Sequence, residues 1–132
     1  MRALTASSIL RLIILVIVLI NCSISGIAGQ KQRSQTGLAK FYAANYDGEK
    51  TASGKKFDKD EYVAAHPSLP LGTIVRVVNL ENNREVKVRI IDRGPVKKER
   101  AKGVIVDLSH KAAEALDFVK KGTTRVRLEV IE

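Results

Sequence analysis

The chain has 132 residues, and its 23 Lys and Arg outnumber its 14 Asp and Glu, for a formal charge of +9 at pH 7. This length allows about one small domain. The single cysteine, Cys22, excludes an internal disulfide framework and a cysteine metal site. The basic residues occur in scattered short pairs without a zinc-finger or RNA-binding motif, so nucleic acid is not an expected partner.

The first 28 residues have the features of a secretory signal peptide. Arg2 and Arg11 flank a start without acidic residues, an unbroken apolar run covers 12–20, and small residues follow up to Ala28. The apolar run is short for a membrane span, so we expect cleavage after Ala28, with a retained N-terminal anchor as the alternative. Removing the two arginines lowers the formal charge from +9 to +7. A basic exported domain is expected in the periplasm or cell envelope, where anionic wall polymer is available.

Cys22 ends the segment Leu19-Ile20-Asn21-Cys22, which partly resembles the processing site of a bacterial lipoprotein. Asn21 departs from that pattern, because a small residue is usual at this position. Two outcomes therefore stay open: loss of Cys22 with the signal peptide, or membrane attachment through a lipidated Cys22.

Residues 29–36 are polar and are predicted to form a flexible leader before a domain over 37–132. Short apolar or alternating segments in this domain predict six strands. The last is the clearest, because its apolar residues alternate with Arg125, Arg127 and Glu129, which gives one buried and one solvated face. The predicted strands cover 37–42, 62–65, 73–79, 85–92, 104–107 and 124–131.

One helix is predicted from Ser109 to Asp117. Ser109 can cap its N-terminus, and the alanines that follow favour helix. Short strands with one short helix indicate a mainly β fold, in which a small closed barrel removes exposed strand edges.

The segment from Glu85 to Asp92 has the clearest chemical content. Side chains on a strand alternate, so Val88 and Ile90 share the core-facing side and Asp92 continues it at the strand end, before the Gly94-Pro95 turn. The charged form of a carboxyl held against apolar neighbours is disfavoured, and such a group can act as a general acid near neutral pH. The alternative is that Asp92 only hydrogen-bonds the turn backbone.

The order and spacing of several short motifs resemble the rare lipoprotein A (RlpA) family of bacteria. The resemblance covers nearly the whole chain after the signal, and it implies a six-stranded double-psi β-barrel, related to that of expansins, with a sugar-binding groove across one face. The matching segments are Gly37-Leu38-Ala39-Lys40-Phe41-Tyr42, Thr51-Ala52-Ser53-Gly54, Phe57-Asp58, Ala64-Ala65-His66, Leu69-Pro70-Leu71-Gly72-Thr73, Val77-Val78-Asn79-Leu80, Asp92-Arg93-Gly94-Pro95 and Asp107-Leu108-Ser109.

The resemblance implies a lytic transglycosylase that cleaves the MurNAc–GlcNAc bond of peptidoglycan and leaves 1,6-anhydroMurNAc ends, on glycan strands without stem peptides. By this resemblance Asp92 is the catalytic acid and base, Asp58 and His66 lie beside it in the groove, and no metal or cofactor takes part. Lys55 stands where the family commonly has Glu. A non-catalytic expansin-like module that binds or loosens the wall is therefore the alternative, and a partner of division-site proteins is a third.

Four residues are expected to bind substrate: Lys55, Ser53, Tyr42 and Arg93. Tyr42 can present an aromatic face to a sugar ring. Arg93 can anchor an acidic substrate group, or pair with Asp92 and weaken it as an acid. Asp107 is expected to support the loop or the helix start.

Overall fold

The computed structural model describes residues 5–14 and 33–132. The chain divides into two compact units, Met1–Gln32 and Arg33–Glu132. In the first unit residues 6–14 are helical, while Cys22 and the expected cleavage site lie outside the described residues. Within the described ranges, no helix has both the length and the apolar character needed to cross a membrane.

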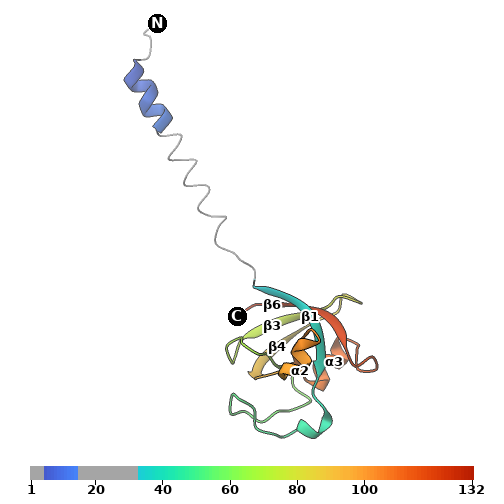
Figure 1. Ribbon diagram of the computed structural model, residues 1–132. Helices are drawn as coiled ribbons and strands as arrows, with labels where there is room; N and C mark the ends of the chain where they lie inside the picture. The colour runs from blue at the N-terminus through green and yellow to red at the C-terminus, as the bar shows by residue number, and fades with distance from the viewer. Residues whose placement is uncertain (1–4, 15–32) are drawn as a thin grey trace. The chain divides into compact units, whose positions relative to one another are not determined.

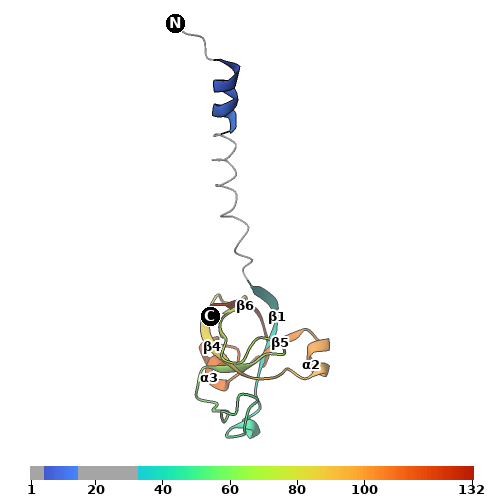
Figure 2. The same cartoon turned by 90° about the vertical axis from the view of Figure 1, so that its left-hand side faces the viewer.

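Six strands of the second unit close into a barrel in the order β1-β5-β2-β4-β3-β6 (Figures 1 and 2). The pairs β1–β5 and β2–β4 are parallel, and the other neighbours are antiparallel. The mainly β, six-stranded barrel expected from the sequence is thus confirmed. The strands are β1 (Ser34–Phe41), β2 (Val63–Ala65), β3 (Ile74–Asn79), β4 (Glu85–Asp92), β5 (Val104–Leu108) and β6 (Thr124–Val130).

The barrel interior is filled by the apolar residues that alternate along the strands. Val88 and Ile90 of β4 and Val126 and Leu128 of β6 are at most 2% exposed. Burying each such side chain contributes about 1.5–3 kcal/mol. Helix α3 (His110–Ala115) adds Ala112 and Ala113 to this core, and the predicted cap is present, because the Ser109 hydroxyl accepts a hydrogen bond from the Ala112 N–H.

The first strand begins earlier than predicted. Residues 34–36, expected to belong to the leader, form the start of β1 and pair with Arg127 to Glu129 of β6. Their polar side chains gave no strand pattern, but they are exposed, and the pairing needs only their backbone groups.

The prediction of one short helix was incomplete. The second unit also contains α2 (Lys97–Ala101) and the 3-10 turn η1 (Ala44–Tyr46). Neither element has a buried residue, so neither has the apolar periodicity that identifies a helix in a sequence.

A second, smaller apolar cluster lies on the outer face of the barrel wall. Val63 of β2 and Ile91 of β4 alternate with the core residues of their strands, and Phe57 from the long β1–β2 connection packs on them together with Tyr42. Through this cluster the β1–β2 connection packs on the ends of the strands, where it forms one wall of a pocket.

Candidate active site

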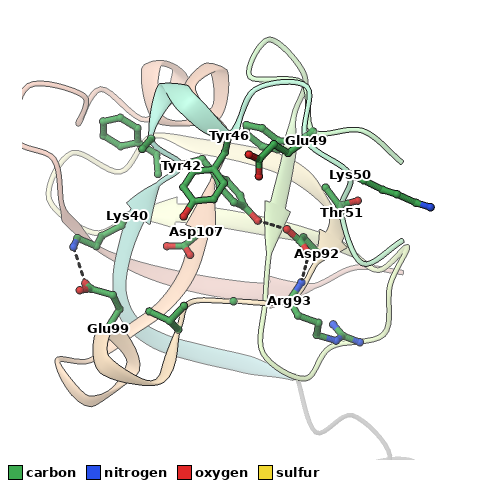
Figure 3. Close-up of a pocket in the computed structure, with 15 residues that line it drawn as sticks. Lys40, Tyr42, Tyr46, Glu49, Lys50, Thr51, Asp92, Arg93, Glu99 and Asp107 are labelled. Carbon is green, nitrogen blue, oxygen red and sulfur yellow. Dashed lines mark hydrogen bonds and ion pairs between the residues drawn. The ribbon is translucent and has the colours of Figure 1, made fainter. Parts of the chain in front are cut away.

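A pocket of about 340 Å³ opens on the outer face of the barrel (Figure 3). Its walls come from the end of β1, the connection that follows it, the turn after β4 and helix α2. Four carboxyl groups line it, those of Glu49, Asp92, Glu99 and Asp107. Asp92 comes from the end of β4 and Asp107 from β5.

The carboxyl of Asp92 is held by three hydrogen-bond donors. Its Oδ2 accepts from the Tyr42 hydroxyl at 2.8 Å, and its Oδ1 accepts from the backbone N–H groups of Ala52 at 3.0 Å and Arg93 at 2.8 Å. An ionised carboxylate accepts hydrogen bonds and donates none, which matches this set of donors. The contacts fix the orientation of Asp92 at the pocket edge.

Asp92 does not continue the core-facing side of β4, as the simple alternation predicted. The pairing of β4 with β2 shifts between Ala64 and Ala65, so Ala64 lies opposite Ile90 and Ala65 opposite Asp92. Because opposite residues project to the same face and consecutive residues to opposite faces, Asp92 leaves the side of Ile90 and joins the outer face. The expected position at a pocket edge holds, but for this different reason.

Tyr42 positions Asp92 rather than offering a free ring to a sugar. Its ring packs against Phe57, with the ring centres 4.3 Å apart. Burial, and then the hydrogen bond to Asp92, raise the pKa of Tyr42, so its hydroxyl remains a donor. The exposed aromatic ring in the pocket belongs to Tyr46, which is 46% exposed and lies edge-on to Tyr42.

Arg93 lines the pocket but is directed away from Asp92. Its Nη1 donates to the carbonyl oxygens of Leu69 at 2.7 Å and His66 at 3.2 Å. In the described part of the chain Arg93 forms no ion pair, so the pairing with Asp92 that would weaken an acid is absent there.

Asp107 lies half-buried in the same pocket, opposite Lys40 of β1 and Ala65 of β2. Burial raises the pKa of Asp107 to about 6; Lys40 opposes this shift, while Glu99 and Asp92 add to it. From its place in the sequence, Asp107 was expected only to support the loop or the helix start. The signal was present, since Val106 and Leu108 face the core and Asp107 must therefore face the outside.

His66 lies beneath the surface and does not line this pocket. It is 4% exposed, its Nε2 bonds the Gln35 side-chain oxygen at 3.0 Å, and its Nδ1 accepts from the N–H groups of Ser68 and Leu69. Burial, and then the charge of Arg93, lower the pKa of His66. These contacts shape the turn that receives Arg93.

The other predicted site residues lie in the β1–β2 connection, outside the lining of this pocket. Asp58 accepts the Asp60 N–H at 2.8 Å, Lys55 pairs with Glu61 at 2.8 Å, and the hydroxyls of Ser53 and Thr51 bond at 2.9 Å. Asp58 and Lys55 line a separate, more open cleft. The structure thus brings Asp92, Tyr42 and Arg93 together in the pocket lining. The backbone of His66 contacts Asp92 and Arg93, but the residues outside this lining are Asp58, His66, Lys55 and Ser53.

Related proteins of known name match the barrel region. The chain is 45% identical over 95 residues to the endolytic peptidoglycan transglycosylase RlpA of Campylobacter jejuni, covering 72% of this chain and 33% of that protein. It is 42% identical over 101 residues to the protein of the same name from Haemophilus influenzae, covering 76% of this chain and 34% of the relative. The chain therefore spans about a third of the length of these relatives.

Solved structures share the fold at lower identity. The Streptomyces papain inhibitor superposes with a TM-score of 0.59 at 22% identity, covering 79% of this chain and 96% of the inhibitor. A Clavibacter michiganensis expansin superposes with a TM-score of 0.57 at 20% identity, covering 75% of this chain and 50% of the expansin. Residues 34–128 also match the lytic transglycolase family, and with this barrel and the close RlpA relatives the chain belongs to that family.

Proposed function

We propose that this chain is an endolytic lytic transglycosylase of the bacterial wall. It cleaves the bond between MurNAc and GlcNAc in peptidoglycan and leaves 1,6-anhydroMurNAc ends, preferentially on glycan strands without stem peptides. The observation that carries the proposal is the carboxyl of Asp92, fixed by three donors at the edge of a pocket of about 340 Å³. The names of the RlpA relatives support the substrate and the reaction class.

The reaction requires two proton movements and no water. The C6 hydroxyl of MurNAc attacks its own anomeric carbon, so one proton must reach the departing oxygen and another must leave the C6 hydroxyl. Positioned carboxyl groups accelerate such transfers by about 10²–10⁴-fold. Among the described residues Asp92 Oδ2 has one donor, the Tyr42 hydroxyl, which leaves this oxygen able to contact a substrate hydroxyl.

The rest of the pocket suits a charged glycan. The Tyr46 ring offers an apolar face for a sugar. Lys50 and Arg93 also line the pocket, and their side chains extend on the side of Asp92 away from Tyr46 (Figure 3). We propose that these cations receive the acidic lactyl group of a MurNAc residue without its stem peptide. Export to the periplasm follows from the proposed signal peptide, and contact with division-site proteins belongs to the same proposal. Membrane attachment through a lipidated Cys22 is the alternative to cleavage after Ala28.

The test is incubation of the purified protein with peptidoglycan, both intact and freed of stem peptides by an amidase, followed by mass spectrometry of the fragments. Anhydro-ended fragments are expected from the wild type, in greater yield from the stripped wall. In Asp92→Asn the rate should fall by about 10²–10⁴-fold, because an amide cannot exchange the proton. The exposed Asp117→Asn makes the same chemical change far along the sequence and should leave the rate unchanged.

Two results would contradict the proposal. Fragments with water-added reducing ends would indicate a hydrolase at the same pocket. Binding to the wall without fragments would favour the non-catalytic, expansin-like module.

A further inference from the structure

We infer that Asp107 donates the proton to the departing glycosidic oxygen, and that Asp92 is the base that takes the proton from the C6 hydroxyl. This division of work rests on the proposed function, and it replaces the expectation that Asp92 does both. It makes Asp107 a second catalytic residue.

The barrel places the two carboxyls on either side of one small residue. Ala65 of β2 lies opposite Asp92 of β4 on one side and opposite Asp107 of β5 on the other. Neighbouring strands lie about 4.8 Å apart, so the two backbone positions are about 10 Å apart. Ala65 itself is fully buried, with the Gly94 backbone packed over it, whereas both acidic side chains line the pocket.

The turn after β4 closes over Asp107. A Cβ atom at Gly94 would lie 3.3 Å from Asp107 Oδ2 and 3.5 Å from the Ala65 side chain. Gly94 has φ +146°, which favours glycine at this position. The backbone of the turn therefore covers one side of the Asp107 carboxyl, while Asp107 still lines the pocket.

The two carboxyls have opposite hydrogen-bond environments. Asp92 accepts three hydrogen bonds, whereas within residues 5–14 and 33–132 the side chain of Asp107 accepts none. A half-buried carboxylate without donors is poorly solvated and favours its protonated form. Figure 3 shows Asp92 on the side of Arg93 and Asp107 on the side of Lys40.

The charges around Asp107 come from each element packed on it. Lys40 on β1 is a cation that favours ionisation of Asp107, but its Nζ is held by Glu99 of α2 at 2.6 Å. Asp92 on β4 and Glu99 favour the proton on Asp107, and the Tyr42 hydroxyl is neutral. The resulting pKa of about 6 suits a general acid. Two carboxyls whose environments differ in this way form the usual acid–base arrangement of glycosidic cleavage.

The step balances without water. The Asp107 proton passes to the glycosidic oxygen as the bond from that oxygen to the MurNAc C1 breaks. The C6 oxygen forms a new bond to C1, and its proton passes to Asp92 Oδ2. Asp92 and Asp107 then exchange one proton with solvent, which restores the starting state.

The test distinguishes the proton donor, Asp107, from the base, Asp92, by comparing a leaving group that needs a proton with one that does not. The substrates are stripped glycan strands and a GlcNAc–MurNAc disaccharide with a 4-nitrophenyl group at C1 of MurNAc, whose departure as nitrophenolate needs no acid. Asp107→Asn should lose at least about 100-fold on the glycan but less than tenfold on the aryl glycoside. Asp92→Asn should lose activity on both, and Asp117→Asn on neither.

The pH profile gives a second readout. With the glycan, the wild-type kcat/KM should fall as the pH rises above about 6, because Asp107 loses its proton. With the aryl glycoside this fall should be absent. The inference is overturned if Asp107→Asn loses the same activity on both substrates, or if kcat/KM falls above about pH 6 with both. Anhydro products from the glycan would still support the proposed function in that case. Absence of anhydro products from the wild type would instead overturn the proposed function.

Discussion

Asp92 and Asp107 are chemically identical residues whose roles differ through their surroundings. Asp107 has a pKa of about 6, against 3.8 for an ordinary aspartate, so the folded protein holds this proton more tightly than the unfolded chain. The resulting stabilisation is fully present below pH 3.8 and is lost as the pH rises through about 6. Asp107→Asn should therefore increase the free energy of unfolding more at pH 7.5 than at pH 3.5. The effects at the two pH values should differ by at most about 3 kcal/mol.

Urea unfolding of the wild type and Asp107→Asn at the two pH values measures this difference, with Asp117→Asn as the exposed control. An effect of Asp107→Asn that is the same at both pH values would show that the ionised carboxyl carries no cost of burial. A gain in stability at pH 7.5 with a loss of turnover is the pattern of a residue kept for function.

For single residues, the sequence predicted that the carboxyl of Asp92 reaches a pocket, but it did not predict the hydrogen bonds that hold this carboxyl. The Asp92 segment was identifiable from its own residues. The three donors to Asp92 come from the turn after β4, from Tyr42 and from Ala52, and no local pattern joins these segments. The burial of Asp107 depends on the path of the Gly94 backbone, so it could not be predicted from the sequence either.

Among the elements, α2 controls the charge next to Asp107. Its Glu99 binds Lys40 of β1 and also Lys102 at 3.3 Å. Glu99→Gln leaves Lys40 without its anion, so the pKa of Asp107 should fall and the alkaline limb of the glycan pH profile should move to lower pH. Lys40→Gln should move the limb to higher pH. Because these side chains are partly exposed and screened, kcat/KM at pH 7 should change by roughly twofold to fivefold, in opposite directions.

The matched control is Lys102→Gln, which leaves the Lys40–Glu99 pair in place and should not move the limb. Shifts in the same direction for Glu99→Gln and Lys40→Gln would show that α2 acts through its packing and not through its charge.

The elements themselves were predictable where a core pattern marks them. The strand β6 alternates along its length, and the helix α3 has a capping serine and buried alanines. The helix α2 consists of Lys, Glu, Arg and Ala and buries nothing, so only the path of the chain between β4 and β5 reveals it. The first three residues of β1 were missed for the same reason.

For the whole molecule, Ser34, Gln35 and Thr36 extend the β1–β6 pairing that closes the barrel, and they support the site. Ser34, Gln35 and Thr36 pair with β6, and the Gln35 side chain bonds His66, whose turn in turn receives Arg93. Each backbone hydrogen bond contributes about 0.5–1.5 kcal/mol, and an unpaired buried ring nitrogen of His66 costs about 1–3 kcal/mol. A chain that starts at Gly37 should therefore be less stable than one that starts at Arg33 by about 2–5 kcal/mol.

Urea unfolding followed by circular dichroism compares the two chains, and Gln35→Ala in the longer chain isolates the contact with His66. This variant should lose about 1–3 kcal/mol, whereas the exposed Ser34→Ala, which keeps the backbone pairing, should lose less than about 0.5 kcal/mol. Equal urea midpoints for the chains starting at Arg33 and Gly37 would mean that the barrel closes without the start of β1. The role of His66 would then have to be sought at the pocket, as the family resemblance implies, rather than in the closure of the fold.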